Sequence, residues 1–417
     1  MNILWITNIG FPEAQVLLKG KGSLKSSGGW MLGAAEALAR EPGVKLTVAT
    51  VSSDVKELTH LEGKEISYYY IPFGNGNTHI NPEYRKYWRR ISDELLPDIV
   101  HIHGSEYSHG LEYVNECGAA NVVVSIQGLT SAYYYYYYYG VSVGDILKHI
   151  TFRDLIRGTL FQEKRQFQRR GEYEKELISK VHHVIGRTSW DKDHVWSINP
   201  HATYHFCNET LRSEFYSGDR WKYEDCTPCS IFISQATYPI KGLHMLFRAM
   251  PFILRHYPET QIRIAGRDVI RRNGGWKEKL RLSGYGSILK LLIRKYQLEN
   301  NVSFLGNLDA EGMKNEYLRA NVFVCPSTIE NSPNSLGEAQ ILGTPVVASY
   351  VGGVADMMKG DEEHLYRFEE VEMLASKVCG VFGAKDRQND MHEVALKRHD
   401  ISANLNMTLD IYREIAH

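Results

Sequence analysis

Two glutamates, Glu330 and Glu338, lie eight positions apart in the stretch VFVCPSTIENSPNSLGEAQILGTPVVASYVGGVADMM. The first five letters have the apolar character of a buried strand. Ser332 suits the N-cap of a helix and Pro333 its first position, so we expect a helix from there to about Leu342. Glu330 then belongs to the loop between strand and helix, and Glu338 lies about one and a half turns into the helix.

The start of this predicted helix is a candidate phosphate site. The first N–H groups of a helix have no acceptor within it, and the helix dipole favours negative charge there. We therefore expect the N–H groups near Asn334 and Ser335 to face an anionic phosphate, with one carboxylate on each side of the ligand. The alternative is that both glutamates are ordinary solvated residues, one in a loop and one on a helix.

The same stretch resembles the E-x7-E motif of retaining GT-B glycosyltransferases of family four. Residues 184–216 resemble a block found in bacterial polysaccharide-assembly members, in which we expect Asn208 and Glu209 to fix the domain connection. The resemblance covers most of the chain and is strongest from Ser230 to Met358. It implies that Glu330 contacts the donor sugar near the reacting centre and that Glu338 accepts hydrogen bonds from the ribose hydroxyls. The donor-binding residues that it implies are Gly28, Gly29, Lys241, Arg267, Ser332, Asn334, Ser335, Leu336 and Glu338.

The stretch SQATYPIKGLHML resembles the family's loop after the first strand of the donor domain, where a lysine binds the diphosphate. The resemblance makes Lys241 that ligand and a catalytic residue beside Glu330. Family members commonly carry an arginine a few residues earlier, whereas this chain has Gln235 there. Backbone N–H groups, Lys241 and Arg267 must then stabilise the negative charge of the leaving group. For Arg267 the alternative is a solvated position on the surface.

In the N-terminal half, the residues expected to contact the substrates lie in a glycine-rich loop and at the ends of predicted strands. In SSGGWMLGAAEAL, which resembles the family's glycine loop, Gly28 and Gly29 allow backbone to approach the donor phosphates closely. His103 ends the predicted strand DIVHIH, where similar members carry a histidine, and we expect it to be a catalytic residue; a structural histidine is the alternative. Gln127 stands where many relatives have a histidine that contacts the donor sugar, and an amide cannot carry its charge. Arg187 ends another strand and is expected to reach substrate.

Seven consecutive tyrosines, residues 133–139, follow the predicted strand NVVVSIQ. This places the run at the edge of the first domain that, in family-four enzymes, receives the acceptor. Tyrosine rings stack on sugars while their hydroxyls hydrogen-bond, so we expect Tyr133 and Tyr134 to line the acceptor side together with Gln127 and Arg187. The alternatives are packing against the segment that follows, or a loop ordered by acceptor or membrane.

That following segment, residues 147–170, carries seven Lys or Arg side chains against two acids, with apolar residues between them. Such a composition fits the surface of an anionic membrane or a lipid pyrophosphate. A solvated basic helix face is the alternative.

Short apolar runs alternate with helix-length segments along most of the chain, which predicts parallel βαβ units. The runs are NILWIT, KLTVATV, DIVHIH, NVVVSIQ and HHVIG, then SIFIS, QIRIAG, NVSFLG, VFVCP and PVVAS. We therefore expect an α/β protein of the GT-B class, with two doubly wound Rossmann-like domains that face a central cleft. The expected parts are an acceptor-binding domain at 1–207, a hinge at 208–228, a donor-binding domain at 229–398, and a helix at 399–417 that is a candidate to pack back on the N-terminal domain.

The composition of the chain argues against several classes of function. Forty-eight basic against 49 acidic side chains give no global field for nucleic acid. Six cysteines with one C-x-x-C at Cys226 and Cys229 indicate neither a metal site nor a disulfide framework. No apolar run approaches the ~20 residues that span a bilayer, and the start lacks the features of a signal peptide. We expect a cytoplasmic protein, with the inner face of the membrane as a candidate location.

The resemblance implies retaining, metal-independent transfer of a hexosyl unit from a nucleoside diphosphate sugar to a glycan or lipid-linked acceptor in cell-surface polysaccharide biosynthesis, without a cofactor. Two alternatives stay open. One is a nucleotide-sugar epimerase or phosphorolytic enzyme on the same architecture, and the other is a catalytically idle sugar-binding assembly protein.

Overall fold

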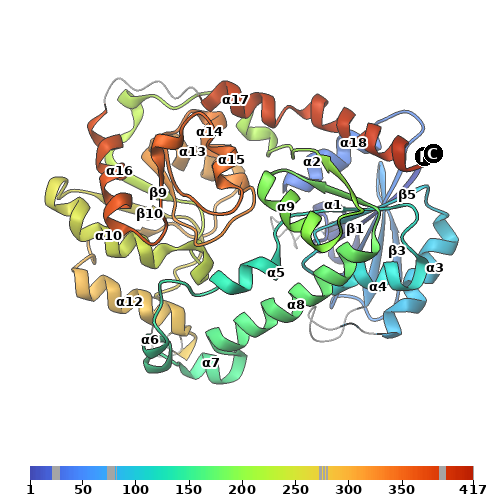
Figure 1. Cartoon of the computed structure of the whole chain (residues 1–417), viewed down its shortest axis with the longest axis horizontal. Coiled ribbons are helices and arrows are strands. Elements are labelled where there is room, and N and C mark those ends of the chain that lie inside the picture. The colour runs from blue at the N-terminus through green and yellow to red at the C-terminus, as the bar shows by residue number, and fades with distance from the viewer. Residues whose placement is uncertain are drawn as a thin grey trace. The chain divides into compact units, whose positions relative to one another are not determined.

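A computed structural model describes residues 1–20, 29–72, 80, 82–271, 275, 278, 280–384 and 391–416 of the 417-residue chain. The chain forms two compact units, and both draw on distant parts of the sequence (Figure 1). Unit 1 comprises Met1–Ala132, Phe167–Arg212 and Arg398–His417, and unit 2 comprises Tyr133–Gln166 and Ser213–Lys397. The tyrosine run and the first part of the basic segment therefore pack with the C-terminal half of the chain, while the C-terminal helix packs with the N-terminal half.

Unit 1 is built on an eight-stranded sheet of described residues, in the order β3-β4-β2-β1-β5-β6-β7-β8. Its strands are β1 (Asn2–Thr7), β2 (Lys45–Ser52), β3 (Thr59–Glu62), β4 (Ile66–Pro72), β5 (Ile99–His103), β6 (Val122–Ser125), β7 (His183–Gly186) and β8 (Thr203–Phe206). Neighbouring strands run parallel, except that β3 is antiparallel to β4. The five strands expected here from apolar runs are all present.

Helices cover both faces of this sheet, which makes the unit doubly wound. They are α1 (Pro12–Lys19), α2 (Gly29–Ala39), α3 (Arg85–Leu95), α4 (Ser108–Cys117), α5 (Thr130–Tyr133), α8 (Leu160–Lys180), α9 (Ser189–Ile198) and α18 (Ile401–Ala416). One hydrophobic core joins the sheet to α3, α4, α8 and α9, and a second joins its other face to α1, α2 and α18 (Figure 1). Alternate residues of β1 and β5 point into the two cores, as the two-residue period of a strand requires.

Helix α18 is fixed to the sheet by buried polar contacts as well as by apolar ones. Trp5 Nε1 donates to Tyr412 Oη at 3.0 Å, and Tyr412 Oη lies 2.6 Å from His101 Nδ1. On the other side of the same ring, His101 Nε2 lies 2.5 Å from Ser125 Oγ. Burial lowers the pKa of His101 to about 3, so the ring is neutral at physiological pH, and one of its nitrogens donates while the other accepts.

Unit 2 contains a parallel six-stranded sheet of described residues, in the order β11-β10-β9-β12-β13-β14. The strands are β9 (Thr227–Ile233), β10 (Gln261–Ile264), β11 (Val302–Phe304), β12 (Ala320–Cys325), β13 (Val346–Ser349) and β14 (Leu365–Tyr366). The helices are α6 (Val143–Lys148), α7 (Phe152–Arg157), α10 (Leu243–His256), α12 (Gly284–Tyr296), α13 (Ala310–Arg319), α14 (Asn334–Leu342), α15 (Val354–Met357), α16 (Val371–Gly383) and α17 (Met391–Arg398).

Both sheets position candidate site residues at the carboxyl ends of parallel strands. In unit 2, β9 and β12 are direct neighbours, so the loops that follow them meet at one edge. In unit 1, β5, β6, β7 and β8 are consecutive neighbours, and the same argument holds. Ligands of doubly wound folds bind at such edges. No helix in the described part of the chain combines the length and apolarity needed to cross a bilayer.

Candidate functional site

Unit 2 contains a largely buried ion pair between Lys241 and Glu330. Lys241 ends a short 3-10 helix, η5 (Pro239–Lys241), after β9, and Glu330 lies in the loop after β12. Lys241 Nζ is 2.5 Å from Glu330 Oε1, and the same oxygen accepts a hydrogen bond from Ser327 Oγ at 2.8 Å. Burial alone lowers the pKa of Lys241, but the charge and hydrogen bond of Glu330 outweigh it and hold that pKa above its ordinary value. The pair is therefore a fixed cation beside a fixed anion.

Two glycines hold the backbone around this pair in place. Gly242 has φ of 69°, and a Cβ there would lie 1.7 Å from the carbonyl oxygen of Pro326. Gly352 has φ of 49°, and a Cβ there would lie 1.9 Å from the carbonyl oxygen of Glu330. Both positions need a residue without a side chain, because they combine a left-handed backbone with close approach to another chain segment. The glycines in IKGL and VGGV thus set the positions of Lys241 and Glu330.

Helix α14 begins one residue later than the sequence predicts. Its first residue is Asn334, and Pro333 is the N-cap, with ψ of 119° and no capping hydrogen bond from a side chain. The expectation that Ser332 caps the helix is therefore wrong: the residue before a proline is kept extended, and Ser332 lies outside the helix. Its hydroxyl is buried without a hydrogen-bond partner among the described residues.

The residues expected at the start of α14 differ in what they offer a ligand. Asn334 and Ser335 are the first two helical residues, whose N–H groups have no acceptor within the helix. The Leu336 side chain is fully buried in the core, and its N–H donates to the carbonyl of Pro333 at 2.9 Å. Neither group is therefore free to contact a ligand. Gly343 ends the helix in the left-handed conformation, as expected.

Glu338 lies one turn further along α14 and is 5% exposed. Tyr317 of α13 donates to its Oε2 at 3.3 Å and to the carbonyl of Ser335 at 3.0 Å. Tyr317 was not singled out from the sequence, yet it ties the glutamate to the helix start. Arg267, by contrast, is exposed after β10, and the described structure gives it no contact with Lys241 or Glu330.

The glycine loop expected in unit 1 falls partly outside the described residues. Gly28 lies outside them, and Gly29 is the first residue of α2. A role for Gly28 and Gly29 in phosphate binding stays a prediction.

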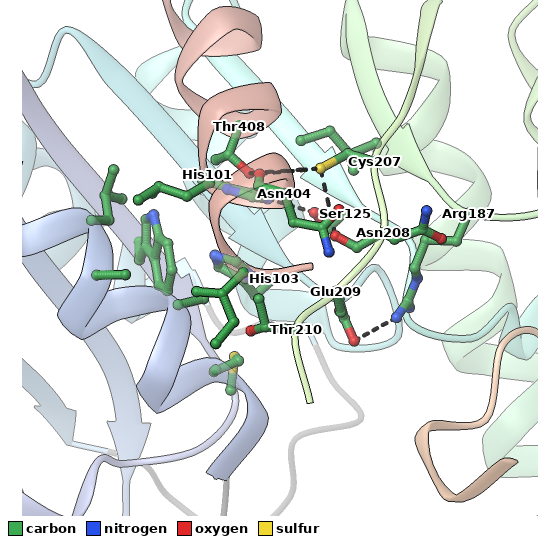
Figure 2. Close-up of a pocket in the computed structure, with 18 of the residues that line it drawn as sticks. His101, His103, Ser125, Arg187, Cys207, Asn208, Glu209, Thr210, Asn404 and Thr408 are labelled. Carbon is green, nitrogen blue, oxygen red and sulfur yellow. Dashed lines mark hydrogen bonds and ion pairs between the residues drawn. The ribbon is translucent and has the colours of Figure 1, made fainter. Parts of the chain in front are cut away.

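A pocket in unit 1 lies at the carboxyl edge of its sheet, and Figure 2 shows His103, Arg187, Glu209 and Thr210 around it. Apolar side chains of β1, α2 and α18 form much of its wall. They are Trp5, Met31, Ala34, Ala37, Leu38, Ile401 and Leu405. The polar groups lie on β5, after β6, after β7 and in the segment that follows β8, which are the neighbouring strand ends expected to meet.

His103 offers the pocket two unused ring nitrogens. Its ring stacks on that of His101 with centroids 3.8 Å apart and lies 4.1 Å from the ring of Trp5. The side chain is buried, and neither nitrogen has a hydrogen-bond partner among the described residues. Burial, with the charge of Arg187 adding to it, puts the pKa of His103 well below its ordinary value. A neutral imidazole presents one donor and one acceptor, so His103 can orient a ligand hydroxyl, but it is a weak base at neutral pH.

Arg187 and Gln127 belong to one buried network with Glu209. Arg187 Nη1 lies 2.5 Å from Glu209 Oε2, and its Nη2 donates to the Gln127 side-chain oxygen at 3.2 Å. Gln127 Nε2 in turn donates to Glu209 Oε1 at 2.6 Å. The charge of Arg187 is thus neutralised by Glu209, which the sequence assigned to the domain connection. The network fixes the pocket wall and leaves little free charge for an anionic ligand.

Sequence reasoning missed Glu106, a carboxyl group in the loop after β5. The space over Gly104 is shared by the carboxylate of Glu106 and the side chain of Gln127. Glu106 Oε2 is buried without a partner among the described residues, and burial raises the pKa of this carboxyl to about 7. Its position after a buried strand, in HGSEY, is the signal that could have identified it.

The tyrosine run is part of unit 2 rather than of unit 1. Thr328 Oγ1, two residues before Glu330, donates to the carbonyl of Tyr136 at 3.0 Å, and the carbonyl of Tyr139 lies 2.8 Å from His244 Nε2. Tyr137 is 4% exposed, whereas Tyr135 is 62% exposed. Tyr133 and Tyr134, the two expected acceptor residues, are half-buried. The run thus packs by its backbone against the loop that carries Glu330.

The two doubly wound α/β units, each built on a mainly parallel sheet, have the fold of GT-B glycosyltransferases. The solved sucrose-phosphate synthase of Thermosynechococcus elongatus has this fold, with a TM-score of 0.69, 17% identity, and coverage of 99% of this chain and 98% of that one. Residues 227–383 match the family model described as glycosyl transferases group 1. This range contains Lys241, Glu330 and Glu338.

Curated proteins that are similar to this chain over part of their length are also named as glycosyltransferases. An uncharacterized glycosyltransferase of Methanocaldococcus jannaschii is 33% identical over 129 residues, which is 31% of this chain and 29% of that protein. The phosphatidyl-myo-inositol mannosyltransferase of Mycobacterium leprae is 25% identical over 191 residues, which is 45% of this chain and 46% of that protein. The similarity therefore spans less than half of either relative.

Proposed function

We propose that the protein is a retaining, metal-independent glycosyltransferase that moves a hexosyl unit from a nucleoside diphosphate sugar to a glycan or lipid-linked acceptor. The observation that carries the proposal is the buried ion pair of Lys241 and Glu330 beside the open start of α14. Similarity to the group 1 family model over residues 227–383 and the GT-B fold support it.

Departure of a diphosphate develops negative charge on its oxygens and positive charge at the anomeric carbon. Lys241 and the first-turn N–H groups of Asn334 and Ser335 stabilise the negative charge. Glu330 stabilises the positive charge or orients a sugar hydroxyl, and Ser327 holds the carboxylate in place through its hydrogen bond. Because protein groups meet the phosphate charge, the reaction needs no metal ion.

Glu338 and Ser332 complete the donor site in this proposal. The Glu338 carboxylate accepts from the ribose hydroxyls, and Tyr317 keeps it at the helix face. The buried, unpaired hydroxyl of Ser332 supplies a further hydrogen bond to the donor.

The unit 1 pocket receives the acceptor. Its apolar walls suit the less polar face of an acceptor, while His103 hydrogen-bonds a hydroxyl group. The low pKa of His103 favours an orienting role, and the departing diphosphate is the stronger candidate to accept the hydroxyl proton. A role in cell-surface polysaccharide assembly at the inner face of the membrane is part of the proposal, on the basis of the sequence resemblance.

The test is nucleotide release from a panel of UDP-, GDP- and ADP-sugars, with and without lipid-linked acceptors. We expect release that depends on acceptor and that Glu330→Ala abolishes, while the control variant Lys359→Met, at an exposed lysine of the same unit, keeps full turnover. Epimerised donor without acceptor would instead support the epimerase, and donor binding without turnover of any donor would support the idle sugar-binding protein.

A further inference from the structure

Two short helices of unit 2 expose a concentration of large apolar side chains. On α6, on α7 and between them, these side chains are 38% to 74% exposed. They are Val143, Leu147, Ile150, Phe152, Leu155 and Ile156, and we call this set the α6–α7 ridge. Single exposed apolar residues are normal on a protein surface, whereas six within 14 positions form a patch that marks an interaction surface.

The ridge belongs to well-formed structure. Ser142 caps α6 by accepting from the N–H of Asp145, and Thr151 forms a full capping box with Asp154 at the start of α7. These caps stabilise helices that are too short to persist alone. The exposure of the ridge is therefore a property of a fixed backbone.

Buried contacts anchor both helices to α12. Asp154 Oδ1 accepts from the N–H of Gly284 at 3.1 Å, and His149 Nδ1 lies 2.9 Å from Ser287 Oγ. Ile146 points inward and is 3% exposed. Each helix thus attaches to α12 through its buried or half-buried residues, while the apolar residues of the ridge are exposed. Figure 1 shows α6 and α7 in the same unit as α12.

The charges around the ridge are mainly positive. Lys148 and Arg157 are exposed, and Arg153 is half-buried beside Asp154. Of the two acids between residues 142 and 158, Asp154 is buried and Asp145 is half-buried in the cap of α6. Cations that flank exposed aliphatic and aromatic side chains match a bilayer interface, where phosphates lie above acyl chains.

We propose that the α6–α7 ridge binds the surface of an anionic phospholipid bilayer, with its apolar side chains among the acyl chains and Lys148 and Arg157 at the headgroups. A bilayer suits the ridge better than a protein partner does, because the side chains project from two short helices and the flanking cations fit a layer of phosphates. The proposal goes beyond glycosyl transfer and does not depend on it.

The test measures binding of the full chain to vesicles by flotation, without any sugar donor. One set of vesicles contains phosphatidylcholine alone, and the other contains phosphatidylcholine mixed with phosphatidylglycerol. We expect the protein to float with the anionic vesicles, and added salt to weaken the association. The variant Leu155→Glu/Ile156→Glu should lose at least about tenfold in affinity, because it places charge on the apolar face.

The matched control is Leu17→Glu/Trp196→Glu, which changes two apolar side chains of unit 1 that are 47% and 68% exposed. It should bind as the wild type does, and circular dichroism should show that both double variants are folded. A Lys148→Gln/Arg157→Gln variant should lose affinity for anionic vesicles alone, which separates the charge contribution from the apolar one.

A fluorescent reporter locates the contact. With Phe152→Trp in the ridge, emission should shift to shorter wavelength when anionic vesicles are added. Absence of vesicle binding, or equal binding by the ridge variant and the control, would overturn the proposal. So would a ridge variant that changes only the self-association of the protein in size-exclusion chromatography, because a second copy would then cover the ridge.

Discussion

Lys241 Nζ lies 2.5 Å from Glu330 Oε1, so the cation and the carboxylate expected to act on opposite charges of the reaction neutralise each other in the free protein. A diphosphate must therefore compete with Glu330 for Lys241. The pair is largely buried, with side-chain exposures of 20% and 9%. Removal of one partner leaves the other charge without its main compensation.

This pair gives the first prediction. Lys241→Met and Glu330→Gln should each lower the free energy of unfolding by about 3 kcal/mol, whereas the double variant should lose clearly less than the sum. Turnover should fall at least about 100-fold in all three. Urea unfolding of the four proteins checks the cycle, and strict additivity would show that the two side chains do not interact in solution.

Gly352 should be as important for activity as the glutamate it accompanies. Gly352→Ala places a methyl group against the carbonyl of Glu330, and we expect a loss of more than about 2 kcal/mol of stability together with most of the turnover. Gly360→Ala is the matched control, because φ there is 96° but the nearest heavy atom to the new Cβ is 4.0 Å away. It should cost only about 1 kcal/mol through the left-handed backbone. Equal losses in the two variants would argue against the clash.

Glu106 should make the stability of the protein depend on pH near neutrality. Its folded pKa is about 7, raised by burial from an ordinary value of 4.5. Between these two values the folded state holds a proton that the unfolded state has lost, so this group lowers stability as pH rises. Glu106→Gln cannot ionise, and its stability relative to wild type should rise by on the order of 2 kcal/mol from pH ~4.5 to pH ~7 and then stay constant. Chemical unfolding of both proteins at several pH values checks this. If the difference between their free energies of unfolding does not change with pH, the raised pKa of Glu106 is contradicted.

Substitutions at buried and exposed tyrosines of the run can separate a role in packing from a role in acceptor binding. Tyr137→Ala should cost about 3 kcal/mol, because the ring is buried and its hydroxyl donates to Glu163 at 3.0 Å. Tyr135→Ala should leave stability within about 0.5 kcal/mol, since the ring is exposed. If the run stacks on acceptor sugars, Tyr135→Ala should raise the acceptor KM about fivefold without changing the donor KM. An unchanged acceptor KM would remove Tyr135 from the acceptor site.

Metal removal should leave turnover intact. Lys241 and the first turn of α14 supply the positive charge that a divalent ion supplies elsewhere. Assays in excess EDTA, and assays after dialysis with added Mg²⁺ or Mn²⁺, should give the same rate. A rate that EDTA abolishes and one of these ions restores would contradict metal-independent transfer.

Apolar periodicity predicted much of the fold because buried parallel strands are near-continuous apolar runs. It missed β4, whose ISYYYIP is dominated by tyrosine, and β8, whose residues are mostly exposed or half-buried. The start of α14 was misplaced because the preferences of serine and proline were applied one residue too early.

The parts that the sequence could not predict depend on contacts between distant residues. The packing of Tyr136 and Tyr139 rests on backbone carbonyls that bond to Thr328 and His244, and a backbone carbonyl carries no sequence signal. The network of Arg187, Gln127 and Glu209 likewise joins three loops whose spacing in the chain says nothing about distance. The orphan nitrogens of His103 follow from burial, which no local pattern reveals.

The contact of Tyr412 with Trp5 and His101 has a consequence for how the protein is made. The ribosome releases Trp5 407 residues before Tyr412, so the second core of unit 1 has no covering α18 until that helix has emerged. Contacts of such high sequence separation form slowly, and apolar surface exposed in the meantime invites aggregation. Unit 2 can complete its sheet earlier. Completion of unit 1 therefore waits for the synthesis of α18, and a fragment truncated before α18 should depend on chaperones to remain soluble.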